Sequence, residues 1–195
     1  MRRALQALVY LFAALGLAGS LLVAYLYVEG RRAEDRLDPK ASQVYRDFAR
    51  RMLEKDAASA SVLKMALAEG VTVKEAIASM ESRAAARNIK LVGRFSMTKE
   101  APGRKGTPDR YAEVFQFCDS GTATALLEYN PDFLAHMPCS IALYQDAGGK
   151  GWLITLNLDL LIHGGREIAP ELKQRILAVK EGLLDIMAAG ATGAL

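Results

Sequence analysis

The feature that most constrains this chain of 195 residues is an uncharged run near its N-terminus, residues 4–28. Of these 25 residues, 21 are hydrophobic, and Gln6 is the only strongly polar side chain. A helix of this length, at about 1.5 Å rise per residue, can cross a hydrocarbon core roughly 30 Å thick. Arg2 and Arg3 precede the run, and a charged segment that begins at Glu29 ends it. The run therefore predicts one N-terminal transmembrane helix, with residues 1–30 as the anchor of a single-pass protein.

A secretory signal peptide is the competing interpretation, because it too has a basic start and an apolar middle. Its apolar region is usually about 7–15 residues long, and no small-x-small cleavage site follows this longer run. We therefore favour an uncleaved signal-anchor.

The basic residues that flank the run do not separate its two ends cleanly. Arg2 and Arg3 lie on one side, and Arg31, Arg32, Arg36 and Lys40 follow the other. Two arginines on so short an N-terminal tail should resist translocation, whereas long domains cross membranes largely regardless of their charge. We therefore expect a cytoplasmic N-terminus in the bacterial inner membrane and a periplasmic domain. Gly16 and Ser20 form a small-xxx-small pair that would let two such helices pair, although small residues are common in membrane helices.

Composition excludes several classes of protein. The hydrophobic fraction of 51% argues against disorder, and two cysteines exclude a disulfide-dense scaffold or a four-cysteine metal site. The net charge of +3 gives no argument for nucleic acid, because 23 basic and 22 acidic residues follow residue 28 and leave that part nearly neutral.

Residues 31–60 are predicted to form a charged helical stalk. Asp38 and Pro39 suit a helix start, and Val44, Phe48 and Met52 recur at fourfold spacing. The arginines of this segment indicate a solvated face or, alternatively, a contact with phospholipid headgroups. The small residues at 57–61 predict a joint with the following domain.

Residues 61–190 are predicted to form a soluble α+β domain. The expected order is β-α-β-β-α-β-β-α, a two-layer domain with a mostly antiparallel five-stranded sheet. Strands are expected at residues 62–68, 89–97, 111–117, 140–144 and 152–158, and helices at 73–87, at 120–129 and from 170 to about 189.

The central third of this domain resembles a known family. The sequence Glu-Val-Phe-Gln-Phe-Cys at residues 113–118, then Asn130-Pro131, Met137-Pro138-Cys139 and the glycine-rich residues 146–151 are similar to the domain of unknown function 302 family. There, a strand ends in a cysteine, a short helix follows, and a Leu-Pro-Cys-like element opens the next strand. Here Met137 replaces the leucine, and Asp119-Ser120 replaces an Asn-Pro pair. The resemblance implies a compact, often dimeric α+β fold and brings no established activity.

Cys118 and Cys139 are the candidate thiol site. Cys118 comes directly before a predicted helix, whose N-terminal dipole favours a thiolate, while Asp119 opposes that charge. If the chain returns toward Cys118, the two sulfurs can form a disulfide, a redox pair or part of a metal site. If the connection is a parallel crossover, they lie at opposite ends of the sheet as small buried hydrophobes.

His136, Met137 and Cys139 add a candidate ligand set of imidazole, thioether and thiol within four residues. Such soft donors suit copper or haem iron, although no paired Cys-x-x-Cys and no haem-attachment motif is present. We therefore assign no metal or cofactor from the sequence and interpret His136 as a partly exposed loop residue and His163 as part of a turn. Residues 103–107 lack the order of a phosphate loop and are interpreted as a basic loop, with anion or partner docking as the alternative.

The sequence gives two hypotheses about function and identifies no reaction. The first is a binding or accessory module at the membrane surface, as a homodimer or in a membrane protein complex. The second is a thiol-redox or metal- or haem-handling protein that uses Cys118 and Cys139.

Overall fold

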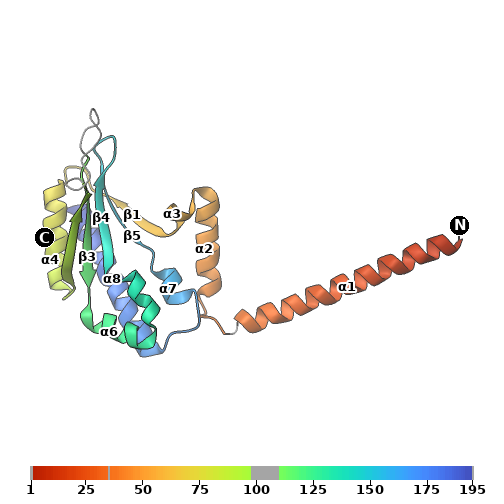
Figure 1. Cartoon of the computed structure of the whole chain (residues 1–195). Helices are drawn as coiled ribbons and strands as arrows, with labels where there is room; N and C mark the ends of the chain where they lie inside the picture. Colours follow the sequence, from red (N-terminus) through yellow and green to blue (C-terminus); the bar gives the residue numbers. More distant parts are fainter. Residues whose placement is uncertain (1, 35, 98–109, 195) are drawn as a thin grey trace.

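The computed structural model describes residues 2–34, 36–97 and 110–194. One long helix, α1 (Arg2–Glu34), extends away from an α+β domain that contains the rest (Figure 1). The apolar window of α1, Val9–Arg32, has a mean hydropathy of 2.1, and none of it is buried against the domain. Within the described ranges, α1 is the one helix long and apolar enough to cross a membrane.

The domain is built on a five-stranded sheet of order β1-β5-β4-β3-β2, in which every neighbouring pair is antiparallel. This arrangement confirms the predicted fold class and the predicted order of strands and main helices. The strands are β1 (Val62–Ala66), β2 (Lys90–Ser96), β3 (Ala112–Cys118), β4 (Cys139–Gln145) and β5 (Gly151–Leu156).

Helices α4 (Val73–Ala86) and α8 (Pro170–Thr192) pack together with one face of the sheet. α4 begins with a capping box, in which Thr72 Oγ1 accepts from the backbone N–H of Glu75 at 3.2 Å and the Glu75 carboxylate accepts from Thr72 N–H at 2.8 Å. α8 begins with Pro170 and ends before Gly193, which has a φ of 69°.

The core lies between these helices and the sheet. Alternation along β3 places Glu113, Phe115 and Phe117 on the helix-facing side, where all three are buried. A second, smaller apolar cluster joins the lower part of α8 to α6 (Ser120–Tyr129) and α7 (Asp159–His163); its buried members are Leu126, Ile162, Ile168 and Ile176. The smaller cluster positions the segment around His163, on which the N-terminal part of the chain rests.

The chain differs from the sequence prediction in four places. The helix expected to start at Asp38 begins at Ala41, as α2 (Ala41–Glu54), because Asp38 turns into the domain. The expected joint at residues 57–61 contains a short helix, α3 (Ala57–Ala60). After α6, the chain forms a 3-10 helix, η1 (Pro131–His136). His163, expected in a turn, is the last residue of α7. The basic loop at residues 103–107 lies outside the described residues.

Candidate functional site

The two cysteines lie at the same end of two neighbouring strands. Cys118 ends β3 and Cys139 begins β4, and the antiparallel register places Cys139 directly opposite Phe117. Cys118 is therefore offset by one position from the residue opposite Cys139. Because successive side chains of a strand point to opposite faces, the two cysteine side chains do not face each other directly. Both thiols are free and half-buried. The topology thus brings the two residues near one another without making them a directly opposed pair.

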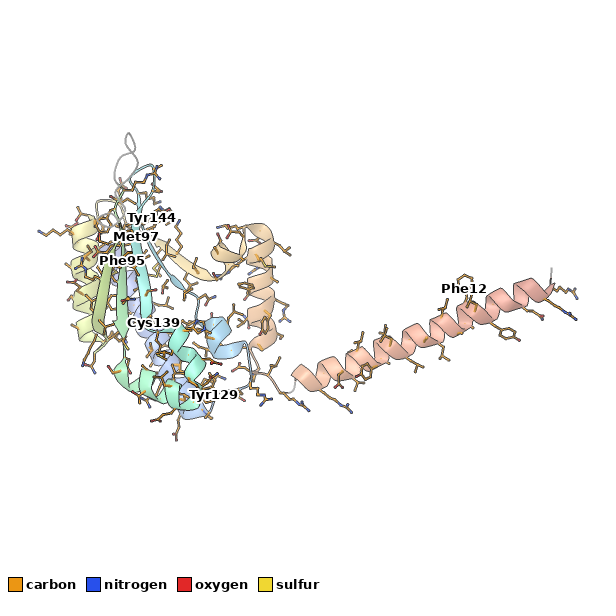
Figure 2. All side chains as sticks on the ribbon, in the orientation of Figure 1. Phe12, Phe95, Met97, Tyr129, Cys139 and Tyr144 are labelled. Atoms are coloured by element: carbon orange, nitrogen blue, oxygen red, sulfur yellow. The ribbon has the colours of Figure 1, made fainter. Side chains whose placement is uncertain are left out.

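Both cysteines line one small apolar cavity of about 40 Å³, and Met137 and Pro138 complete the wall next to them. The space holds about one water-sized group, so a haem would have to bind outside it. Its polar lining, Asp119 and Thr122, belongs to the cap of α6, where the Asp119 carboxylate accepts from Thr122 N–H at 2.7 Å. Figure 2 shows Cys139 where the sheet meets α6.

His136 does not join this group. It ends η1 with an exposed side chain and does not line the cavity, whereas Met137 does. In the described part of the chain, no three His, Cys, Asp or Glu side chains gather as a metal ion would require. The structure therefore unites three of the four predicted site residues.

Burial raises the pKa of the Cys139 thiol to about 11, and the neighbouring Cys118 contributes to the shift. The thiol is therefore protonated at neutral pH. Because the thiolate is the form that attacks electrophiles and binds metals, Cys139 is a poor nucleophile in the folded chain.

A charged network that sequence reasoning missed lies between β2, β3 and α4. The Glu113 carboxylate accepts hydrogen bonds from Arg94 Nε at 2.8 Å and from the Tyr111 hydroxyl, and Arg94 also pairs with Glu81 at 3.1 Å. Burial and the bond to Glu113 raise the pKa of Tyr111, and Glu113 likewise raises the pKa of Arg94. The signal in the sequence was Glu113 itself, an acid on the strand face that otherwise carries Phe115 and Phe117.

A second missed group, which we name the Asp38 cluster, consists of Asp38, His163 and Lys173. The Asp38 side chain is 0% exposed; its Oδ1 lies 3.1 Å from His163 Nδ1, and its Oδ2 forms an ion pair with Lys173. Burial acts to raise the pKa of Asp38, but hydrogen bonds from Lys173, the Lys40 N–H and His163 outweigh it and lower the pKa to about 2. The carboxylate is therefore ionised at all physiological pH values.

Backbone contacts reinforce the Asp38 cluster. Asp38 N–H donates to the Gly165 carbonyl at 2.9 Å, Leu37 forms an isolated antiparallel bridge with Arg166, and the Tyr45 hydroxyl donates to the Gly164 carbonyl. Only residues 35 and 36 separate the end of α1 from Leu37. The segment that follows α1 is thus part of the folded domain from its third residue onward.

Comparison with known proteins assigns the domain to a family. The profile of "Domain of unknown function DUF302" matches residues 64–190, about two thirds of the chain. The chain belongs to the DUF302 family. A solved structure, "uncharacterized conserved protein DUF302 from Bacillus stearothermophilus", is similar in fold, with a TM-score of 0.52 and 15% sequence identity over 66% of this chain and 96% of that one. Comparison with curated proteins finds no match.

The DUF302 region contains the cysteines, Met137, the Glu113 network, His163 and Lys173. Asp38, α1 and α2 precede it. The Asp38 cluster is therefore the point at which the N-terminal segment of this chain is bonded to the DUF302 domain.

We expect Asp38→Asn to lower the free energy of unfolding by about 2–4 kcal/mol, because it leaves Lys173 next to a partner without charge. The stabilisation by a carboxylate of lowered pKa is complete above its unfolded pKa near 4 and is lost as the pH falls toward 2. Thermal unfolding of the full chain in detergent, followed by circular dichroism between pH 2 and 7, measures both effects.

Asp47→Asn is the matched control, since Asp47 pairs with Arg50 at 3.0 Å on the exposed face of α2. Its effect should stay below about 0.5 kcal/mol. Equal destabilisation by the two variants would show that the Asp38 cluster has no special role.

For Cys139, we expect slow alkylation in the native state. In Cys118→Ser, the remaining thiol should react at pH 8 on the order of 100-fold more slowly in the folded chain than in urea, because its thiolate is depleted. Mass spectrometry of timed iodoacetamide reactions gives the rates, and Cys139→Ser reports on Cys118 as the control. Similar rates for Cys139 in the folded and unfolded states would contradict the buried, protonated thiol.

Proposed function

We propose that this protein is a single-span protein of the bacterial inner membrane whose DUF302 domain acts as a binding or assembly module at the membrane surface. The observation that carries the proposal is the short connection from α1 to the Asp38 cluster. A domain on a flexible tether would sample a wide volume, whereas Leu37 and Asp38 are hydrogen-bonded into the domain two residues after α1 ends. The domain is therefore kept at the membrane, with one side directed toward it.

The proposed orientation of the chain in the membrane depends on the charges that flank α1. Arg2 and Arg3 at the short N-terminal end favour the cytoplasm, and a folded domain of this size can be translocated. In this arrangement the DUF302 domain is periplasmic.

The partner surface of the module is the edge of the sheet at β2. Val92, Phe95 and Met97 are 54%, 53% and 49% exposed, and Figure 2 shows Phe95 and Met97 close together on one part of the domain. Among the described residues, β2 has a strand neighbour on one side only, and that leaves its other edge available for strand pairing. A second copy of the chain, or a strand of a membrane partner, would cover both the open edge and the apolar side chains.

Thiol-redox or metal-handling activity is the second candidate function. The proximity of Cys118, Cys139 and Met137 around one cavity supports it. The raised pKa of Cys139 and the separate position of His136 weigh against it. The alkylation experiment above separates the two functions, since a redox-active pair must include an accessible thiolate.

The proposal predicts that the full chain stays in the membrane pellet after an alkaline wash, while a variant that lacks residues 4–28 is released. Fusions after Leu195 test the orientation: alkaline phosphatase should be active, and green fluorescent protein should be dark. Release of the full chain by alkali would contradict the anchor. A bright fluorescent fusion with an inactive phosphatase would contradict the periplasmic domain while leaving the anchor in place.

A further inference from the structure

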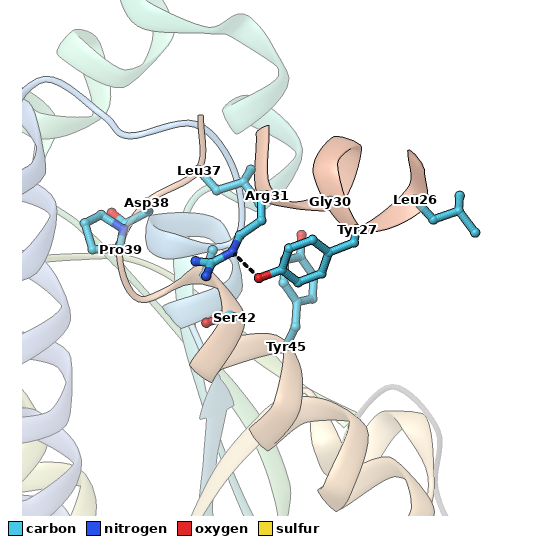
Figure 3. A pocket seen from close by; sticks show the side chains of 10 residues that line it. Leu26, Tyr27, Gly30, Arg31, Leu37, Asp38, Pro39, Ser42 and Tyr45 are labelled. Carbon is cyan, nitrogen blue, oxygen red and sulfur yellow. Dashed lines mark hydrogen bonds between the residues drawn. The ribbon is translucent and has the colours of Figure 1, made fainter. Parts of the chain in front are cut away.

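A cavity of about 660 Å³ lies where the last turns of α1 meet the first turn of α2 (Figure 3). α1 contributes Leu26, Tyr27 and Arg31 to its wall, and Leu37, Ser42 and Tyr45 contribute from the segment that follows. The volume falls in the range of roughly 300–1,000 Å³ typical of small-molecule sites. The lining combines apolar walls with one guanidinium and several hydroxyls.

The charge that this cavity presents is positive. Arg31 Nε donates to the Tyr27 hydroxyl at 3.2 Å, and the guanidinium lies 5.6 Å from the centre of the Tyr27 ring, which orients it (Figure 3). No carboxylate among the described side chains pairs with Arg31, whereas its neighbour Arg32 is paired with Glu29 at 3.3 Å. Asp38 also lines the cavity, but its carboxylate is fully buried against His163 and Lys173. An anion is therefore the ligand that Arg31 favours.

The position of the cavity narrows the kind of anion. It begins at Leu26 and Tyr27, near the C-terminal end of the apolar window of α1. Under the proposed membrane span, this level coincides with the lipid headgroups, where tyrosines are enriched. A phospholipid offers a phosphate to Arg31, hydroxyl or ester oxygens to Ser42, and acyl chains that continue along the exposed side of α1. Free phosphate would satisfy only the first of these contacts.

We propose that this cavity binds the headgroup of an anionic phospholipid, with Arg31 donating to the phosphate. The inference deepens the proposed function and depends on α1 spanning the membrane. Arginine binds phosphate through two parallel N–H groups. Nε of Arg31 is already bonded to Tyr27, whereas Nη1 and Nη2 form no hydrogen bond to the described part of the protein. A bound lipid would then contact both α1 and α2 and set the angle between the anchor and the domain.

Native mass spectrometry of the full chain, released from nanodiscs of equal parts phosphatidylcholine and phosphatidylglycerol with identical acyl chains, tests the proposal. The wild-type chain should retain phosphatidylglycerol in preference to phosphatidylcholine. Arg31→Ala should reduce that retention about tenfold, the effect of losing one or two charged hydrogen bonds. Arg32→Ala removes the same charge one residue away and should keep the preference.

Equal loss in both variants would overturn the proposal, because it would reduce the effect to general charge. Displacement of phosphatidylglycerol by inorganic phosphate would overturn the proposal in favour of a free-anion site. Retention of a second protein in place of lipid would overturn it too, because a protein would then cover the cavity. Circular dichroism of each variant verifies folding. A chain that does not enter nanodiscs at all would contradict the membrane anchor, whereas a chain that enters them without a specific effect of Arg31 contradicts this inference alone.

Discussion

The arrangement of this protein depends on one buried carboxylate. Asp38 lies four residues after α1 ends, yet its side chain is enclosed by His163 and Lys173 from the far end of the sequence. Removing a charge from water is costly, and only the surrounding donors make the ionised state favourable, as the lowered pKa shows. Together with the backbone contacts of Leu37 and Asp38 to Arg166 and Gly165, these side-chain contacts join the segment that follows α1 to the domain.

Much of the fold could be predicted because local signals agree with the tertiary structure. The Thr72–Glu75 capping box, Pro170 at the start of α8 and the alternation along β3 each specify an element from a few residues. The Asp38 cluster could not be predicted in this way. Asp38 followed by Pro39 has the pattern of a helix start, and nothing local indicates that its partners lie more than 120 residues away. His163 was missed for the same reason, since a histidine followed by two glycines is typical of a turn.

The candidate site shows where sequence reasoning stops. The spacing of Cys118 and Cys139 left two topologies open, and only the antiparallel pairing of β3 and β4 places them at the same end of the sheet. The chemistry of Cys139 was also beyond the sequence, because the burial that keeps its thiol protonated depends on how the sheet packs. Membership of the DUF302 family accounts for the fold and assigns no activity to it.

Residues 37–45 are bonded to the folded domain through Leu37, Asp38 and Tyr45. Hydrogen–deuterium exchange of the full chain in detergent measures this most directly, through the amides of Leu37 and Asp38, which precede α2. We expect the Asp38 amide, which is bonded to Gly165, to be protected at a level comparable with β3 and β4. In Asp38→Asn this protection should be lost while the sheet stays protected. Exchange of this amide at the rate of an unstructured peptide in the wild-type chain would contradict the bonding of this segment to the domain.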